Sequence, residues 1–216
     1  MSEEEKIGDI GRENMLLAAG ELTAAKQLQN VARAQVKKAK ARRGLMDAES
    51  EIAKHRENLA KDYRAVTRKK ENLALDGLLE VNKEELGKEE ADAEYHHVIA
   101  RLQTRAAKIN EKIAQQDVIL SQENTKLANL IFQSAKARKL LGKKQLSFVD
   151  IKKKGSPEEK IKAAMNAYLD QQKIFQKIQK QITEQKSLIR VKQNNLADTR
   201  KELSETISEL EKIRHK

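Results

Sequence analysis

Residues 156–182, SPEEKIKAAMNAYLDQQKIFQKIQKQI, join a strong helix start to an apolar residue at every seventh position. Ser156 is a typical N-cap, Pro157 suits the first helical turn, and Glu159 completes a capping box. Continued toward the C-terminus, the seven-residue step meets only large apolar side chains: Ile161, Tyr168, Phe175, Ile182, Ile189, Leu196, Leu203 and Leu210. Such a repeat keeps one stripe against a partner when helices supercoil, so we predict a long helix over residues 157–214.

The first third of the chain carries the same repeat. Nine of the ten residues at sevens from Ile10 are apolar: Ile10, Leu17, Ala24, Val31, Lys38, Leu45, Ile52, Leu59, Val66 and Leu73. A second seam position is filled by Leu28, Ala34, Ala41, Ala48 and Tyr63. Because Asp76-Gly77 provides a stop signal, we predict a helix over residues 12–76, preceded by a flexible acidic N-terminus, residues 1–11.

The middle of the chain has the fullest seam. Asn82 is a suitable N-cap, and Glu84 and Glu85 favour a helix start. Apolar residues then follow a three-four spacing, with Gln116, Glu123 and Ser134 as interruptions: Ile99, Leu102, Ala106, Ile109, Ile113, Leu120, Leu127, Leu130, Ala137 and Leu141. Gly142 after several basic residues reads as a helix end, so we predict a helix over residues 83–141.

These patterns predict an all-α fold, an elongated antiparallel three-helix coiled coil. Residues 12–141 would form a long helical hairpin, residues 142–156 a basic and apolar loop, and residues 157–216 the third long helix. The composition agrees, since 36% of the residues are charged and only 3% are aromatic. A single long rod whose helices pair only between chains is the alternative. The third helix meets polar residues at its second seam position around residues 185–200, so we expect its middle to be the least tightly held part.

The predicted loop places apolar side chains between lysines, and we name this set the basic-apolar tip. It comprises Lys143, Lys144, Leu146, Phe148, Val149, Ile151, Lys152, Lys153 and Lys154. One interpretation is that the apolar residues plug the end of the bundle. The other is that they form an exposed docking knob, with the lysines steering an acidic partner or lipid headgroups.

Two further charged surfaces stand out. Residues 71–94 hold nine acidic and two basic residues, a net charge of −7, and from these we define the acidic tip: Glu80, Glu84, Glu85, Glu89 and Glu90. Six basic residues of the first helix form the anionic-surface belt: Arg33, Lys37, Lys38, Lys40, Arg42 and Arg43. Together with the net charge of +11, the belt favours an anionic partner. Its charges are also typical of an ordinary solvated helix face.

Signals for catalysis, metals and cofactors are weak. The chain has no cysteine, and we expect neither a metal nor a cofactor. Asp92 and His96 share a helical face, but adjacent His96 and His97 point about 100° apart, so they cannot serve one site. No phosphate-binding loop or triad can be argued, so we do not expect an enzyme. The acidic N-terminus and the lack of a membrane-length apolar run lead us to expect a cytoplasmic protein.

We therefore expect a non-enzymatic scaffold that self-associates and bridges protein partners through the basic-apolar tip and the acidic tip. The alternative is a peripheral binder of anionic surfaces, with membrane ahead of nucleic acid. Three long helices with a basic surface make the chain similar in shape to BAR-type membrane-curving dimers and to ESCRT-III-like helical hairpins. This resemblance is one of shape and is carried by no motif.

Overall fold

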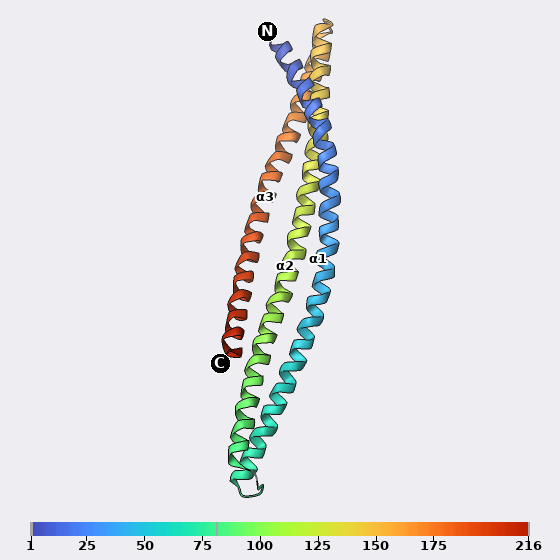
Figure 1. Cartoon of the computed structure of the whole chain (residues 1–216). Coiled ribbons are helices and arrows are strands. Elements are labelled where there is room, and N and C mark those ends of the chain that lie inside the picture. Colours follow the sequence, from blue (N-terminus) through green and yellow to red (C-terminus); the bar gives the residue numbers. More distant parts are fainter. Residues whose placement is uncertain (1, 81, 216) are drawn as a thin grey trace. The chain divides into compact units, whose positions relative to one another are not determined.

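The computed structural model describes residues 2–80 and 82–215, which contain three α-helices and no strand. These are α1, Glu3–Leu75, α2, Lys83–Lys153, and α3, Glu158–Arg214 (Figure 1). The predicted all-α fold class with three long helices is confirmed. The chain forms two compact units, each with a part of every helix. Unit 1 comprises Met1–Lys37 and Ile119–Lys192, and unit 2 comprises Lys38–Val118 and Gln193–Lys216.

Helices α1 and α2 are antiparallel in both units. In unit 1 the Asn14 side-chain amide donates to Gln145 Oε1 at 3.0 Å, and the Gln29 amide donates to Asn129 Oδ1 at 2.8 Å. In unit 2 the Lys70 ammonium pairs with Glu89 at 3.1 Å. As one moves forward along α1, its partners therefore move backward along α2.

A heptad of small residues joins α1 to α2. On α1 the buried residues at this spacing are Gly11, Ala18, Ala25, Ala32, Ala39, Ala53 and Thr67. The matching buried residues on α2 are Leu86, Ala93, Ala100, Ala114, Ala128, Ala135, Gly142 and Val149. The closest approach is at the glycines, because a Cβ built on Gly142 would lie 2.6 Å from the Gly11 carbonyl oxygen. The helices touch through their backbones there.

The heptad that starts at Ile10, predicted as the packing seam of α1, does not form the contact with α2. Its large members are exposed in the structure, from Ile10 and Leu17 through Val31 to Val66. The physical reason is that the small-residue heptad begins one position later and lets the two backbones approach closely. Close packing of many atoms along the seam compensates for the small area of each alanine.

Helix α3 packs on α2 much as its own heptad predicts. Ile182, Ile189 and Leu196 are buried, and the remaining members of that stripe are partly buried. Polar residues complete the second seam position. The Gln171 amide donates to the Ala137 carbonyl at 3.1 Å, and the Gln185 amide donates to Glu123 Oε2 at 2.8 Å. Two of the three polar interruptions of the α2 seam thus accept hydrogen bonds from α3, Glu123 from Gln185 and Ser134 Oγ from the Gln179 amide at 2.6 Å.

The prediction of a flexible N-terminus over residues 1–11 is wrong, because α1 begins at Glu3. Ser2 and Glu5 form a capping box, in which the Glu5 N–H donates to Ser2 Oγ at 3.3 Å and the Ser2 N–H donates to Glu5 Oε2 at 2.8 Å. Two otherwise unpaired backbone donors are satisfied in this way. Gly11 then packs against Gly142, which holds the first turns on α2.

The expected loop at residues 142–156 is wrong over residues 142–153, because α2 continues to Lys153, and the connection to α3 is confined to residues 154–157. Gly142 is helical and serves the close approach to α1, whereas Gly155, with φ of 61°, ends the helix. Gly77, with φ of 69°, follows α1 as predicted. The N-cap at Asn82 is confirmed, since its Oδ1 accepts from the Glu84 N–H at 3.0 Å.

We predict that Gly142→Ala lowers the free energy of unfolding by about 1–3 kcal/mol, because its new methyl group meets the Gly11 carbonyl oxygen and the Met15 backbone nitrogen, which cannot rotate away as the Met15 side chain can. Gly20→Ala is the matched control in unit 1, since a Cβ there meets nothing within 4 Å. It should stabilise by about 0.5–1 kcal/mol through helix propensity. Urea unfolding followed by circular dichroism measures both. Equal effects of the two variants would contradict the backbone contact.

Candidate interaction surfaces

The apolar part of the basic-apolar tip lies inside unit 1. Phe148 and Val149 are each 5% exposed. The Phe148 ring stacks on Tyr168 with 6.1 Å between centroids, and Val149 lies 3.7 Å from the position of a Cβ at Gly8. Leu146 and Ile151 are partly buried. This geometry corresponds to the plug, and Phe148 and Val149 do not form an exposed knob.

The lysines of the basic-apolar tip are exposed: Lys143, Lys144, Lys152, Lys153 and Lys154. Lys152 forms an ion pair with Glu4 at the start of α1. The hydrogen bond from Lys152 lowers the pKa of Glu4 to about 2. Part of the positive charge that the sequence places here is therefore neutralised by the acidic N-terminus.

A lysine face continues along α2 toward the middle of unit 1. Lys136, Lys139 and Lys143 follow each other at helical spacing and are exposed, with the exposed Leu140 between them. Lys136 also lies over the Phe132 ring, 4.5 Å from its centroid. Unit 1 as a whole holds 22 basic and 12 acidic residues, a net charge of +10. Unit 2 holds 22 basic and 21 acidic residues, a net charge of +1.

The anionic-surface belt lies on α1, and its six residues are exposed: Arg33, Lys37, Lys38, Lys40, Arg42 and Arg43. Arg42 pairs with Asp117 at 3.4 Å, and Arg43 pairs with Asp47 at 3.7 Å. Surface pairs of this kind contribute little stability, and they reduce the charge that the belt offers to a ligand.

The acidic tip surrounds the connection between α1 and α2 in unit 2. Glu80, Glu84 and Glu85 are exposed, while Glu89 and Glu90 are partly buried. Local lysines neutralise two of these carboxylates, since Lys88 pairs with Glu84 at 3.0 Å and Lys70 pairs with Glu89 at 3.1 Å. The structure places the acidic tip in unit 2 and the basic-apolar tip in unit 1.

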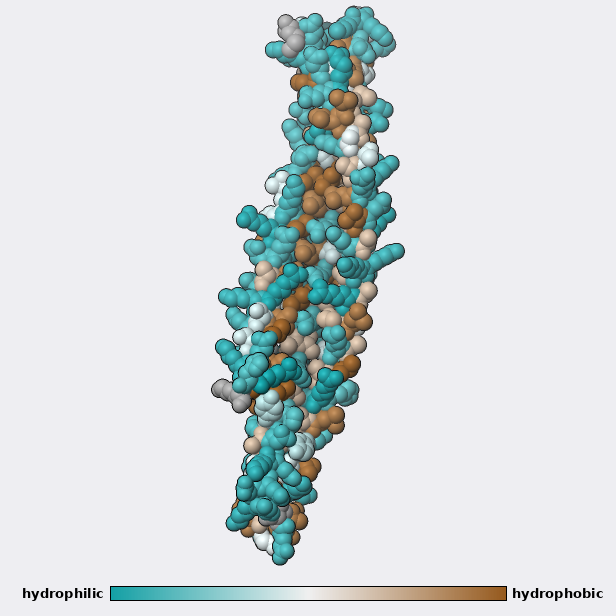
Figure 2. All heavy atoms as spheres, viewed as in Figure 1, coloured by the Kyte–Doolittle hydropathy of each residue, from teal (hydrophilic) through white to brown (hydrophobic). Residues whose placement is uncertain are grey.

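The large apolar heptad of α1 is a surface that the sequence analysis misplaced. In unit 2, Leu45, Ile52, Leu59 and Val66 are 65%, 53%, 68% and 56% exposed, and we name them the α1 stripe. Figure 2 shows apolar side chains, in brown, open at the surface among charged ones. The signal that could have revealed this was the small-residue heptad one position later on α1, matched by a second one on α2.

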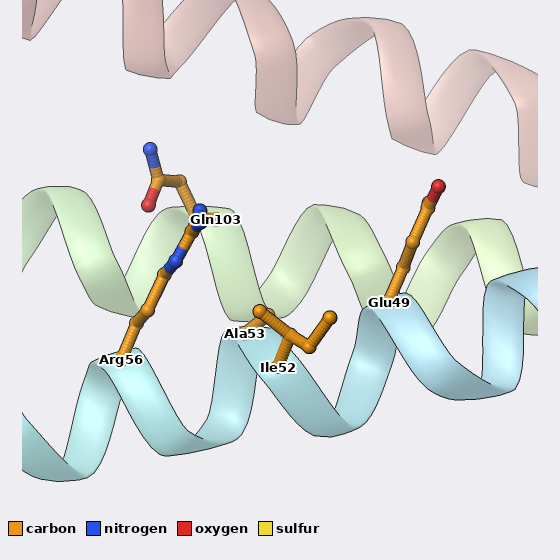
Figure 3. Close-up of a pocket in the computed structure, with 5 residues that line it drawn as sticks. All are labelled: Glu49, Ile52, Ala53, Arg56 and Gln103. Atoms are coloured by element: carbon orange, nitrogen blue, oxygen red, sulfur yellow. The ribbon is translucent and has the colours of Figure 1, made fainter.

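A shallow groove of about 390 Å³ runs beside the α1 stripe (Figure 3). Ile52 lies between Glu49 and Arg56, and all three project from one side of α1, with Ala53 and Gln103 completing the lining. An apolar side chain flanked by opposite charges is the arrangement found along helix-pairing surfaces.

Residues 2–80 and 82–215 contain neither a metal-ligand cluster nor a membrane-length apolar helix. No group of three His, Cys, Asp or Glu side chains in this part of the chain could hold a metal ion. His96 Nε2 lies 3.4 Å from Asp92 Oδ1, and both side chains are exposed. None of the described helices has the length and apolar character that crossing a membrane requires.

Comparison of the chain with protein families, curated proteins and solved structures finds no match.

We predict that Phe148→Ala lowers the free energy of unfolding by about 3–5 kcal/mol, because it empties a packed site next to Tyr168. Leu140→Ala, on the exposed face of the same helix, is the matched control and should change stability by about 0.5 kcal/mol or less. Thermal and urea unfolding of both variants test this. Unchanged stability of Phe148→Ala would support the knob instead.

The Glu4 carboxylate should titrate far below its ordinary pKa of 4.5. Because the pKa is lowered in the folded chain, the stabilisation is complete above pH 4.5 and is lost as the pH falls toward 2. A carboxyl-carbon NMR titration of wild type and Lys152→Ala measures this, and the variant should raise the pKa of Glu4, with the hydrogen bonds from its own backbone N–H and from Ser2 still holding it below the ordinary value. Lys153→Ala is the control and should leave Glu4 unchanged. A wild-type midpoint near 4.5 would refute the ion pair.

Proposed function

We propose that this chain is a non-enzymatic helical scaffold that self-associates and holds protein partners through exposed faces of its helices. The observation that supports it most is the α1 stripe, four large apolar side chains more than half exposed at heptad spacing. Covering such a side chain is worth about 1.5–3 kcal/mol, so a helix with a matching seam gains much by binding there. The groove of Figure 3, in which the apolar Ile52 lies between the charged Glu49 and Arg56, has an arrangement of the kind that helix pairing uses.

The charged surfaces supply the second part of the proposal, the binding of partners. The exposed lysines of the basic-apolar tip and the carboxylates of the acidic tip belong to different units, so they can engage different partners. The buried Phe148 and Val149 are left out of this contact, and the lysines carry it. Charges of this kind increase association rates and are screened by salt.

A second candidate function is peripheral binding of anionic surfaces. The net charge of +10 in unit 1 and the lysine face of α2 favour it. Leu140 adds an apolar contact among the lysines, a combination that suits a lipid interface more than a nucleic acid.

Self-association is tested by multi-angle light scattering and sedimentation equilibrium of the full chain over a wide concentration range. We expect the mean mass to rise above 24.6 kDa with concentration. A constant monomer mass up to the highest soluble concentration would remove the self-associating scaffold.

Co-sedimentation with anionic and neutral vesicles, and with duplex DNA, at low and high salt tests the second candidate. Salt-sensitive binding to anionic vesicles alone supports it, and binding to DNA alone points to nucleic acid instead. The variant Lys136→Glu/Lys139→Glu/Lys143→Glu should then bind at least about tenfold more weakly, at about 1 kcal/mol per lysine near an anionic surface. A lack of binding to either leaves the scaffold proposal alone.

A further inference from the structure

Helix α3 ends well before the connection between α1 and α2. In unit 2, Lys112 pairs with Glu202 at 3.8 Å and Arg105 pairs with Glu209 at 3.6 Å. Helix α3 ends at Arg214, only five residues beyond Glu209, so its end is level with about Ala100 of α2. Beyond that point the chain continues as two helices, as Figure 1 shows. We name residues 58–79 and 82–99 the turn-end hairpin.

The turn-end hairpin has a thin core. The residues buried between its two helices include Thr67, Leu86 and Ala93, of which only Leu86 is large. Hydrophobic stabilisation scales at about 0.8 kcal/mol per buried CH₂ group, and the close packing that compensates for small side chains along the full seam extends here over only about 20 residues of each helix. Most helical stability in proteins comes from tertiary packing, so further contact on an open face would stabilise this pair of helices.

The turn-end hairpin carries an exposed apolar face. Leu59, Tyr63 and Val66 of α1 are exposed there. On α2, Tyr95 is exposed and Ile99 is partly exposed. Tyr95 lies one heptad before Leu102, and Ile99 lies one heptad before Ala106, so the two residues continue the α2 seams toward the turn. The apolar face of α2 thus continues past the end of the helix that covers it.

The charges around this face are complementary between two copies of the hairpin that lie antiparallel to each other. Residues 71–94, at the turn, have a net charge of −7. Residues 54–70 hold seven basic and two acidic residues, and residues 95–112 hold four basic and one acidic residue, giving +5 and +3. Two copies laid antiparallel bring the acidic turn of each beside the basic flanks of the other. A parallel arrangement would instead set acidic turn against acidic turn.

We propose that the turn-end hairpins of two copies of this chain pack antiparallel and complete a four-helix bundle. This inference rests on the proposed self-associating scaffold and names the surface and the orientation. An overlap over the turn-end hairpin takes in about 20 residues of each helix, roughly 30 Å at 1.5 Å per residue. The α1 stripe residues Leu59 and Val66, with Tyr63, Tyr95 and Ile99, form the interior of this bundle.

The first test compares the dimer dissociation constants of full-length variants by sedimentation equilibrium. Leu59→Glu/Val66→Glu should raise the constant at least about 30-fold, because it places charges in the dimer core. Both residues are exposed in the single chain, so the fold should survive, and circular dichroism checks this. Leu45→Glu is the matched control, because Leu45 belongs to the same stripe but lies outside the turn-end hairpin. It should leave the constant within about threefold.

The second test determines orientation. Since the chain contains no cysteine, single-cysteine variants at Leu59, Val66 and Leu73 can be oxidised and their cross-linked fractions compared. Antiparallel packing centred near Val66 predicts strong cross-linking at position 66 and at least about fivefold less at positions 59 and 73. The two copies of each outer residue then lie about 20 Å apart along the helix axis, which is too far for a disulfide. Equal cross-linking at all three positions would mean parallel packing and overturn the proposal.

The outcomes separate this inference from the proposed function. A dimer weakened by Leu45→Glu but not by Leu59→Glu/Val66→Glu keeps the scaffold and overturns the turn-end hairpin as its interface. A chain that stays monomeric at all concentrations would contradict both the self-associating scaffold and the turn-end hairpin interface. A dimer that tightens as salt rises would overturn the charge complementarity on which the antiparallel arrangement depends.

Discussion

The contact between the backbones of α1 and α2 is the constraint on which the rest of the structure depends. Two helices can come this close only where both present glycine, alanine or another small side chain, and this chain supplies them at sevens on both helices. Once α1 is committed to that seam, its large apolar residues one position earlier must point elsewhere. The exposed α1 stripe is therefore a direct result of the small-residue contact.

The sequence predicts helix α3 well and α1 poorly, for a physical reason. On α3 one large apolar stripe runs from Ile161 to Leu210, and it is the stripe that packs on α2. On α1 two heptads run side by side, and the usual preference for large core residues selects the wrong one. Periodicity gives the spacing of a seam, whereas its partner depends on which other helix carries a matching shape.

Some features of the candidate surfaces could likewise be predicted from the sequence, whereas others depend on tertiary contacts. Exposure of the anionic-surface belt and the position of the acidic tip beside a helix connection follow from residue order alone. The burial of Phe148 does not, because it depends on α2 continuing through Gly142, which packs against Gly11, far away in the chain. The start of α1 was within reach of the sequence, since Ser2 and Glu5 have the spacing of a capping box. The concentration of positive charge in unit 1 required knowledge of which segments pack together.

The glycine pair has a consequence for how the two helices find their alignment. A seam of nearly identical alanines distinguishes one register from the next only weakly, because a slip of one heptad replaces alanine by alanine at most layers. Gly142 distinguishes the registers, since after such a slip it would no longer lie opposite Gly11 but opposite a residue with a side chain, which would prevent the close backbone approach. Asn14 with Gln145, and Gln29 with Asn129, would lose their hydrogen bonds in the same slip. A few unlike residues in unit 1 thus select one alignment among several that the alanines alone would tolerate.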